Sequence, residues 1–194
     1  MTKTRLEAFS DGVIAILITI MVLELRPPAH GPEGYHELKH AFPAYVLSFL
    51  VVAIYWNNHH HMLHLCTRVN GRILWANLHL LFWLSLIPFG TAWISEPEGL
   101  TSLAAATYGT IAFMAGISWL LLKMAIIAEQ GPDSPLKAAY GADWKGVSSG
   151  VISLLSILLA FVHPYITIAL QVIIVLMWIV PDRRIESRLD HGIG

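Results

Sequence analysis

Long apolar segments separated by short polar ones run through the whole chain. A helix that crosses a bilayer needs roughly 20 mostly apolar residues, and six segments meet or approach that length. We place these spans at residues 6–25, 43–65, 73–94, 103–128, 147–163 and 165–180. Pro88 lies inside the third span, where we expect a kink because proline removes one helical hydrogen bond. The pattern predicts an all-α membrane protein in which residues 1–194 form a single six-helix transmembrane domain.

The connections between the spans are short, and the last of them is the tightest. The sequence VHPYIT joins the fifth and sixth spans, so we expect these two short helices to form a hairpin. The longest loops, residues 26–42 and 129–146, are rich in glycine and proline. We expect neither loop to form an independent fold.

The composition agrees with a chain that lies in lipid. Apolar residues make up 56% and charged residues only 13%, against about 25% charged residues in soluble domains. The mean hydropathy is +0.62. Cys66 is the single cysteine, which excludes an intrachain disulfide and a cysteine-based metal cluster. A net charge of -1 gives no sign of a nucleic-acid partner.

Basic residues fall almost entirely on one side of the predicted membrane. Arg26 and Lys39 are on one side, and ten basic residues are on the other. These ten are Lys3, Arg5, Arg68, Arg72, Lys123, Lys137, Lys145, Arg183, Arg184 and Arg188. Because basic loops stay in the cytoplasm, the count predicts that both termini are cytoplasmic. Five glutamates lie toward the far side, and they form either an acidic mouth that concentrates cations or ordinary polar loops.

The first span, RLEAFSDGVIAILITIMVLEL, has two different faces. At 100° per residue, Gly12, Ile16, Thr19 and Leu23 form one stripe. Asp11 is 140° away from Ile16. One face is therefore aliphatic with a single hydroxyl, and the other carries a carboxylate that needs a partner.

Each of these features also has an ordinary explanation. The stripe is typical of lipid-facing or core packing in any membrane helix. Thr19 is expected to donate a hydrogen bond to the carbonyl of Ala15, four residues earlier. Ser10 and Asp11 suit the first turns of a helix, where they cap it and complement its dipole.

The predicted orientation brings three polar segments to the same depth. The start of the first span, the end of the second and the start of the third all lie on the cytoplasmic side. Buried charges need partners, so Arg5, Ser10 and Asp11 are expected to form a polar network with the second and third helices. The partners we expect there are Trp56, Asn57, His60, Asn77 and His79.

The histidine run in WNNHHH permits a second interpretation. His60 and His64 have the four-residue spacing of a helix-borne zinc pair. Consecutive helical residues point 100° apart, however, and the run lacks an HExxH motif and an adjacent carboxylate. We therefore predict a hydrogen-bonded structural network and no metal site.

These residues carry a resemblance to a known family. RLEAFSDGVIAI resembles the RxxxFSD signature that opens the first helix of the transmembrane-protein-175 family of potassium channels of bacterial and lysosomal membranes. Arg5, Phe9, Ser10 and Asp11 supply the match, and VLEL and WNNHHH also resemble that family. The order of six spans matches its bacterial members over essentially the whole chain.

The resemblance implies a homotetramer in the bacterial plasma membrane, with the first helix of each copy lining a central pore. It implies a modestly potassium-selective cation channel, not an enzyme, with potassium as the permeant ion and no cofactor. It also implies that the RxxxFSD residues tie the first helix to its neighbours, and that an aliphatic ring replaces a carbonyl filter. Carried over to this chain, Ile16 is the main constriction, Ile20 the alternative, and Thr19 and Leu23 lie nearer the outer mouth.

Other classes of function stay open at this stage. Asp11 with His60 and His79 would suit a proton-conducting or proton-coupled transporter. A membrane metalloenzyme would need a general base and a full ligand set, which the histidine run does not supply. A scaffold protein without transport activity is the remaining alternative.

Overall fold

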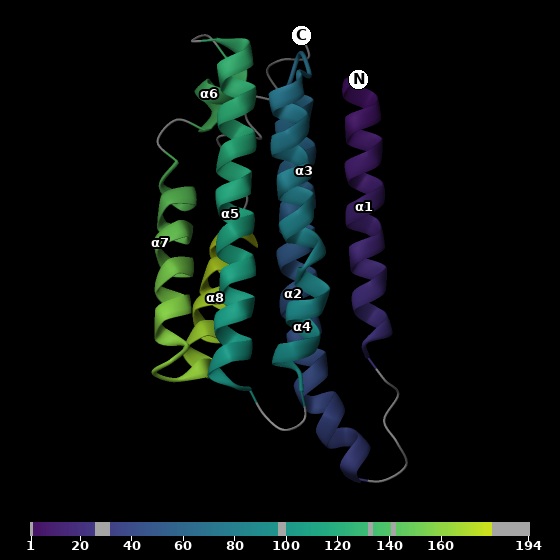
Figure 1. Cartoon of the computed structure of the whole chain (residues 1–194), viewed down its shortest axis with the longest axis vertical. Helices are drawn as coiled ribbons and strands as arrows, with labels where there is room; N and C mark the ends of the chain where they lie inside the picture. The colour runs from purple at the N-terminus through teal and green to yellow at the C-terminus, as the bar shows by residue number, and fades with distance from the viewer. Residues whose placement is uncertain (1, 26–31, 97–99, 132–133, 141–142, 180–194) are drawn as a thin grey trace.

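The computed structural model describes residues 2–25, 32–96, 100–131, 134–140 and 143–179. Within these ranges the ordered segments are helices, which lie side by side along one axis (Figure 1). Their bounds are α1 Lys3–Leu23, α2 Pro32–His64, α3 Gly71–Ser85, α4 Ile87–Ile94, α5 Ser102–Gln130, α6 Pro135–Tyr140, α7 Trp144–Leu159 and α8 Pro164–Ile179. The described part of the chain is thus all-α, as predicted.

Side-chain caps fix where several of these helices begin. Thr2, Thr101 and Asp143 precede α1, α5 and α7, and each accepts a hydrogen bond from a backbone N–H in the first turn. Such a cap satisfies one of the donors that a helix start leaves unpaired. The ends of α1, α5, α7 and α8 lie within four residues of the predicted spans.

The predicted start of the second span at residue 43 is wrong. α2 begins at Pro32, and Pro43 lies inside the helix. A proline ring clashes with the carbonyl four residues earlier and bends a helix without always ending it. The first turns of α2 lean away from the bundle in Figure 1. Its apolar part runs from Leu38 to His64.

The kink predicted at Pro88 is confirmed. The third span consists of α3 and α4, which are separated at Leu86, and Pro88 lies in the first turn of α4. Proline is favoured at this position because its missing N–H has no helical acceptor there.

Among the described residues, four segments are long and apolar enough to cross a membrane: α1, residues 38–64 of α2, α3 with α4, and α5. α7 and α8 have 16 residues each, so each is roughly 24 Å long, against a bilayer core of about 30 Å. Six full spans therefore remain a prediction for this last hairpin. The 129–146 loop contains the short helix α6, which the sequence pattern did not indicate.

Hydrogen bonds bring the expected cytoplasmic segments to one end of the bundle. Lys3 Nζ donates to the His64 carbonyl at 2.8 Å, and Gln130 Nε2 donates to the Leu65 carbonyl at 2.6 Å. The start of α1 and the ends of α2 and α5 therefore meet there. Which side of a membrane this end faces remains a prediction. Arg26, Glu98 and the three arginines of the tail lie outside the described residues.

Candidate functional site

One face of α1 is packed against the rest of the chain. Leu6, Ser10, Ile14, Leu17 and Met21 recur every three or four residues, and each is at most 6% exposed. Helices in lipid associate through close packing and interhelical hydrogen bonds, not through the hydrophobic effect. This face therefore anchors α1 to its neighbours.

A chain of three buried polar side chains crosses from α1 to α3 and α2. Asn77 Nδ2 donates to Ser10 Oγ at 2.9 Å, and Asn77 Oδ1 lies 2.7 Å from His59 Nε2. Ser10 Oγ also donates to the Leu6 carbonyl at 2.8 Å. Ser10 and Asn77 are fully buried, and His59 is 1% exposed. With the His59 proton on Nε2, every member of the chain has a partner, as a buried polar network requires.

A second contact joins α1 to α2 nearer the surface. Trp56 Nε1 donates to Asp11 Oδ1 at 3.0 Å. The His60 ring stacks on the Trp56 ring, with a centroid distance of 6.4 Å. Asp11 is half-buried, whereas Trp56 and His60 are exposed.

The structure places the remaining expected network residues elsewhere. His79 accepts from Trp83 Nε1 at 3.1 Å and lies 2.9 Å from Ser118 Oγ, so it joins α3 to α5. Asn57 is exposed on α2. Arg5 and Phe9 are also exposed, on the side of α1 that carries the stripe.

Sequence reasoning missed His59 and favoured its neighbour His60. A signal was available, because His59 continues the buried stripe of α2 formed by Val52, Met62 and Leu63. A polar residue at an apolar position of this stripe faces the protein interior and needs a partner there.

The other face of α1 is exposed in the single chain. Ile16 is 57% exposed, Ile20 41% and Leu23 78%, and Gly12 and Thr19 are exposed too. Thr19 Oγ1 donates to the Ile16 carbonyl at 2.8 Å, so the expected bond to Ala15 is wrong. The three-residue partner satisfies the hydroxyl hydrogen within the helix and leaves the oxygen lone pairs on the exposed face. The arrangement is an aliphatic stripe with one hydroxyl on a helix that is anchored from behind.

The described part of the chain contains no group of side chains with the geometry of a metal site. No three His, Cys, Asp or Glu side chains come together there as a metal site. His60 and His64 are both exposed on the last turns of α2.

Comparisons with known proteins identify relatives of this chain. Residues 5–88, which contain most of α1 together with Ser10, Asn77 and His59, match the family described as endosomal/lysosomal potassium channel TMEM175. A potassium channel of Chryseobacterium sp. (strain P1-3) is 47% identical over 99% of this chain and 100% of its own length. A potassium channel of Streptomyces collinus is 35% identical over 85% of each chain.

One solved structure shares the fold. It is the crystal structure of a lysosomal potassium-selective channel TMEM175 homolog from Chamaesiphon minutus. The TM-score is 0.79 at 24% sequence identity, and the match covers 92% of this chain and 96% of the other.

Proposed function

This chain belongs to the TMEM175 family of potassium channels, and from this premise we propose that it assembles as a homotetramer whose α1 helices line a potassium pore. The chain is a multi-pass membrane protein of a channel family, not an enzyme. Its bacterial relatives support a place in a bacterial plasma membrane.

The observation that carries this proposal is the exposed stripe of α1. Gly12, Ile16, Thr19 and Leu23 point away from the rest of the chain, while Ser10 and the apolar face behind it are fixed to α2 and α3. A pore helix needs this division, because its pore face has no partner within its own chain. Four copies arranged around an axis would bring the four stripes together.

The constriction in this proposal is a ring of four Ile16 side chains. Ile20, the less exposed residue one turn on, is the alternative ring. Aliphatic side chains that meet on the axis exclude water and close the pore by dewetting. A small outward tilt of α1 would widen the ring and let it fill with water.

Selectivity in such a pore comes from partial dehydration. Potassium holds its water less strongly than sodium. The free-energy cost of removing part of that water at a narrow apolar ring is therefore smaller for potassium. The four Thr19 oxygens replace part of the lost hydration just beyond that ring, and Leu23 borders the outer mouth. This selectivity is modest, because no backbone carbonyl filter replaces the whole hydration shell.

The polar contacts behind α1 set the position of the ring. Ser10–Asn77–His59 and Asp11–Trp56 hold the cytoplasmic half of α1. Arg5 and Phe9 are exposed on the stripe side of α1, so they do not contribute to this attachment within one copy.

The experiment is potassium and sodium flux into liposomes that hold the purified protein. In Ile16→Asn, we expect the ratio of potassium to sodium flux to fall or the resting leak to rise, because a polar ring stays wet. Ile173→Asn is the matched control, since Ile173 is 50% exposed on α8. Flux through Ile16→Asn that equals flux through wild type and Ile173→Asn would remove Ile16 from the pore.

Proton conduction is the second candidate, and the titratable side chains of Asp11 and His60 near the start of α1 favour it. A pH-sensitive dye in the same liposomes tests it. Acidification that proceeds without potassium and is lost in Asp11→Asn would support proton conduction over potassium flux.

A further inference from the structure

A cavity of about 460 Å³ lies between α2, α5, α7 and α8. Its volume is within the range of roughly 300–1,000 Å³ that ligand pockets have. The lining is mainly apolar and includes Val51, Ile54, Phe113 and Ile174. Val151 lines the cavity and is still 53% exposed. The cavity is therefore open to the protein surface on its α7 side.

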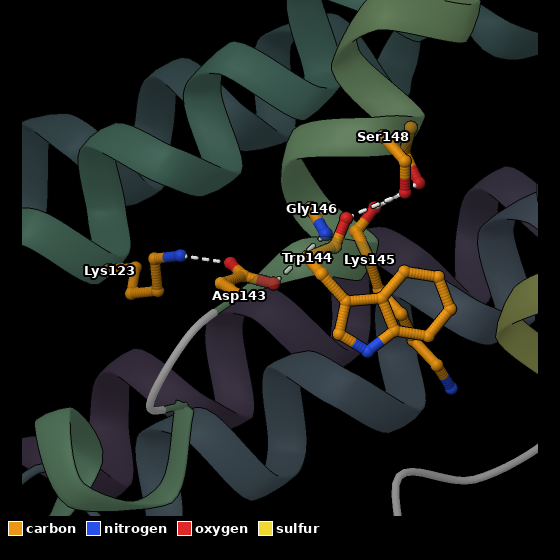
Figure 2. Close-up of polar contacts among 7 residues, drawn as sticks. Lys123, Asp143, Trp144, Lys145, Gly146 and Ser148 are labelled. Atoms are coloured by element: carbon orange, nitrogen blue, oxygen red, sulfur yellow. Dashed lines mark hydrogen bonds and ion pairs between the residues drawn. The ribbon is translucent and has the colours of Figure 1, made fainter.

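One end of this cavity is polar. Lys123 of α5 forms an ion pair with Asp143, and both residues line the cavity. Asp143 also accepts from the Gly146 N–H at 2.9 Å and so caps α7. Figure 2 shows the Lys123 ammonium directed at the Asp143 carboxylate, with Gly146 on its other side.

A second cation lies at the same end. Lys145 Nζ is 5.9 Å from the centroid of the Trp178 ring, and Trp178 lines the cavity. The Trp178 indole N–H donates to Ser149 Oγ at 2.8 Å, and Ser149 Oγ donates to the Lys145 carbonyl at 2.7 Å. These bonds hold the start of α7 against the end of α8. The Lys145 ammonium lies over the ring of Trp178, which is one of the residues that line the cavity.

This polar end has the features of a membrane interface. Trp144 is 55% exposed at the start of α7, and Trp178 lies at the end of α8. Tryptophan gathers at the level of lipid headgroups, and lysine extends its ammonium toward them. Lys123 is seven residues before the end of α5, which corresponds to roughly 10 Å along the helix axis. Because Lys123 pairs with Asp143, the polar end of the cavity lies at that depth.

We propose that the cavity binds an anionic phospholipid, with one acyl chain between α5 and α7 and the phosphate at Lys145. The opening on the α7 side admits a molecule from the bilayer, and the apolar lining suits a hydrocarbon chain. The ammonium of Lys145 complements a phosphate and carries three hydrogen-bond donors. This inference is independent of ion conduction, because it concerns a site on the side of the chain away from α1.

The test is native mass spectrometry of the purified, delipidated protein with added phosphatidylglycerol or phosphatidylcholine of the same acyl chains. Lys145→Gln removes the cation, and Lys137→Gln, at an exposed lysine of α6, is its control. Gly150→Leu places a large side chain at the cavity, because Gly150 lines it and a Cβ there meets no atom within 4 Å. Gly71→Leu is its control, since a Cβ at Gly71 also meets open space.

We expect wild type and both controls to retain phosphatidylglycerol at least fivefold better than phosphatidylcholine. Lys145→Gln should lose that preference, and Gly150→Leu should lose bound lipid of both kinds. Equal retention of phosphatidylglycerol by wild type and both cavity variants would overturn the proposal. A wild-type protein that retains neither lipid would also overturn it. Should Gly150→Leu fail to fold, as judged by circular dichroism, the headgroup preference of Lys145→Gln decides alone.

Discussion

Asn77 shows how one residue joins three helices. Its amide donates to Ser10 on α1 and lies within hydrogen-bond distance of His59 on α2, and all three side chains are buried. Removing it would take away the partner of His59 Nε2 and leave Ser10 Oγ with its bond to the Leu6 carbonyl alone. A buried polar group left unpaired costs about 1–3 kcal/mol. The stability of the attachment of α1 therefore depends strongly on this one side chain.

We expect Asn77→Ala to lower the stability of the purified protein by about 2–4 kcal/mol. Asn57→Ala, an exposed asparagine on α2, should change it by no more than about 0.5 kcal/mol. The measurement is thermal unfolding in detergent followed by circular dichroism. Equal midpoints for the two variants would show that the buried chain does not hold α1.

Cys66 is the single cysteine, and its environment makes it a poor nucleophile. Burial raises the pKa of its thiol above the usual value, and this outweighs the lowering effect of the backbone hydrogen bond with Arg68. A raised thiol pKa means a smaller thiolate fraction at neutral pH, and the thiolate is the reactive form.

Maleimide labelling of wild type should therefore be slow at pH 7.5 and should accelerate as the pH rises. Labelling of glutathione under the same conditions gives the reference rate. Labelling of Cys66 as fast as that of glutathione would contradict the buried, protonated thiol.

At the scale of elements, α5 is the helix against which the α7–α8 hairpin packs. Close approach is possible because Gly109 has no side chain: a Cβ there would lie 3.1 Å from Ser156 Oγ and 3.3 Å from Ile157 Cγ1. Ser156 is also the point where the hairpin is joined, since its carbonyl accepts from Thr167 Oγ1 at 2.8 Å. An added methyl group at Gly109 would therefore crowd Ser156 and displace the hairpin from α5.

Two glycines of the same helix allow a matched comparison. Gly116→Ala adds a Cβ whose nearest neighbour is Tyr55 OH at 3.9 Å, so it should stabilise α5 by up to about 1 kcal/mol through helix propensity. Gly109→Ala should gain nothing or lose about 1–3 kcal/mol, because the hairpin must move. The measurement is the thermal unfolding midpoint of each variant relative to wild type. A stabilising effect of the same size at both positions would mean that the packing at Gly109 is loose.

At the scale of the whole molecule, α1 is anchored on one face and exposed on the other. A single copy leaves Leu23 78% exposed at the end of α1. In the proposed tetramer, the exposed faces of the four α1 helices surround a common axis. In a monomer, the same face would contact lipid acyl chains.

Crosslinking of single cysteines separates these two arrangements. In a Cys66→Ser background, Leu23→Cys should yield covalent dimers with a bifunctional maleimide, because four copies of the outer mouth lie around one axis. Leu158→Cys on α7, where the leucine is 61% exposed, should stay monomeric. Crosslinking at residue 158 but not at residue 23 would place another helix at the centre of the assembly.

Local patterns in the sequence were enough to predict that the six apolar segments are helical, that the third is kinked at Pro88 and that α1 has two different faces. Periodicity and proline chemistry are local, and they act through the backbone of the segment that contains them. Trp56 and His60 stack because residues four apart share a helix face, which is also a local property.

Which polar residues meet depends on how the helices pack against one another. His59 rather than His60 reaches Asn77, and His79 turns to Ser118 on α5, because the rotation of each helix is fixed by the packing of its whole apolar face. The helix start at Pro32 was also beyond local reasoning, since a proline bends or ends a helix according to what supports the turns before it. The cavity beside Lys145 exists only where four helices come together, so no single stretch of sequence encodes it.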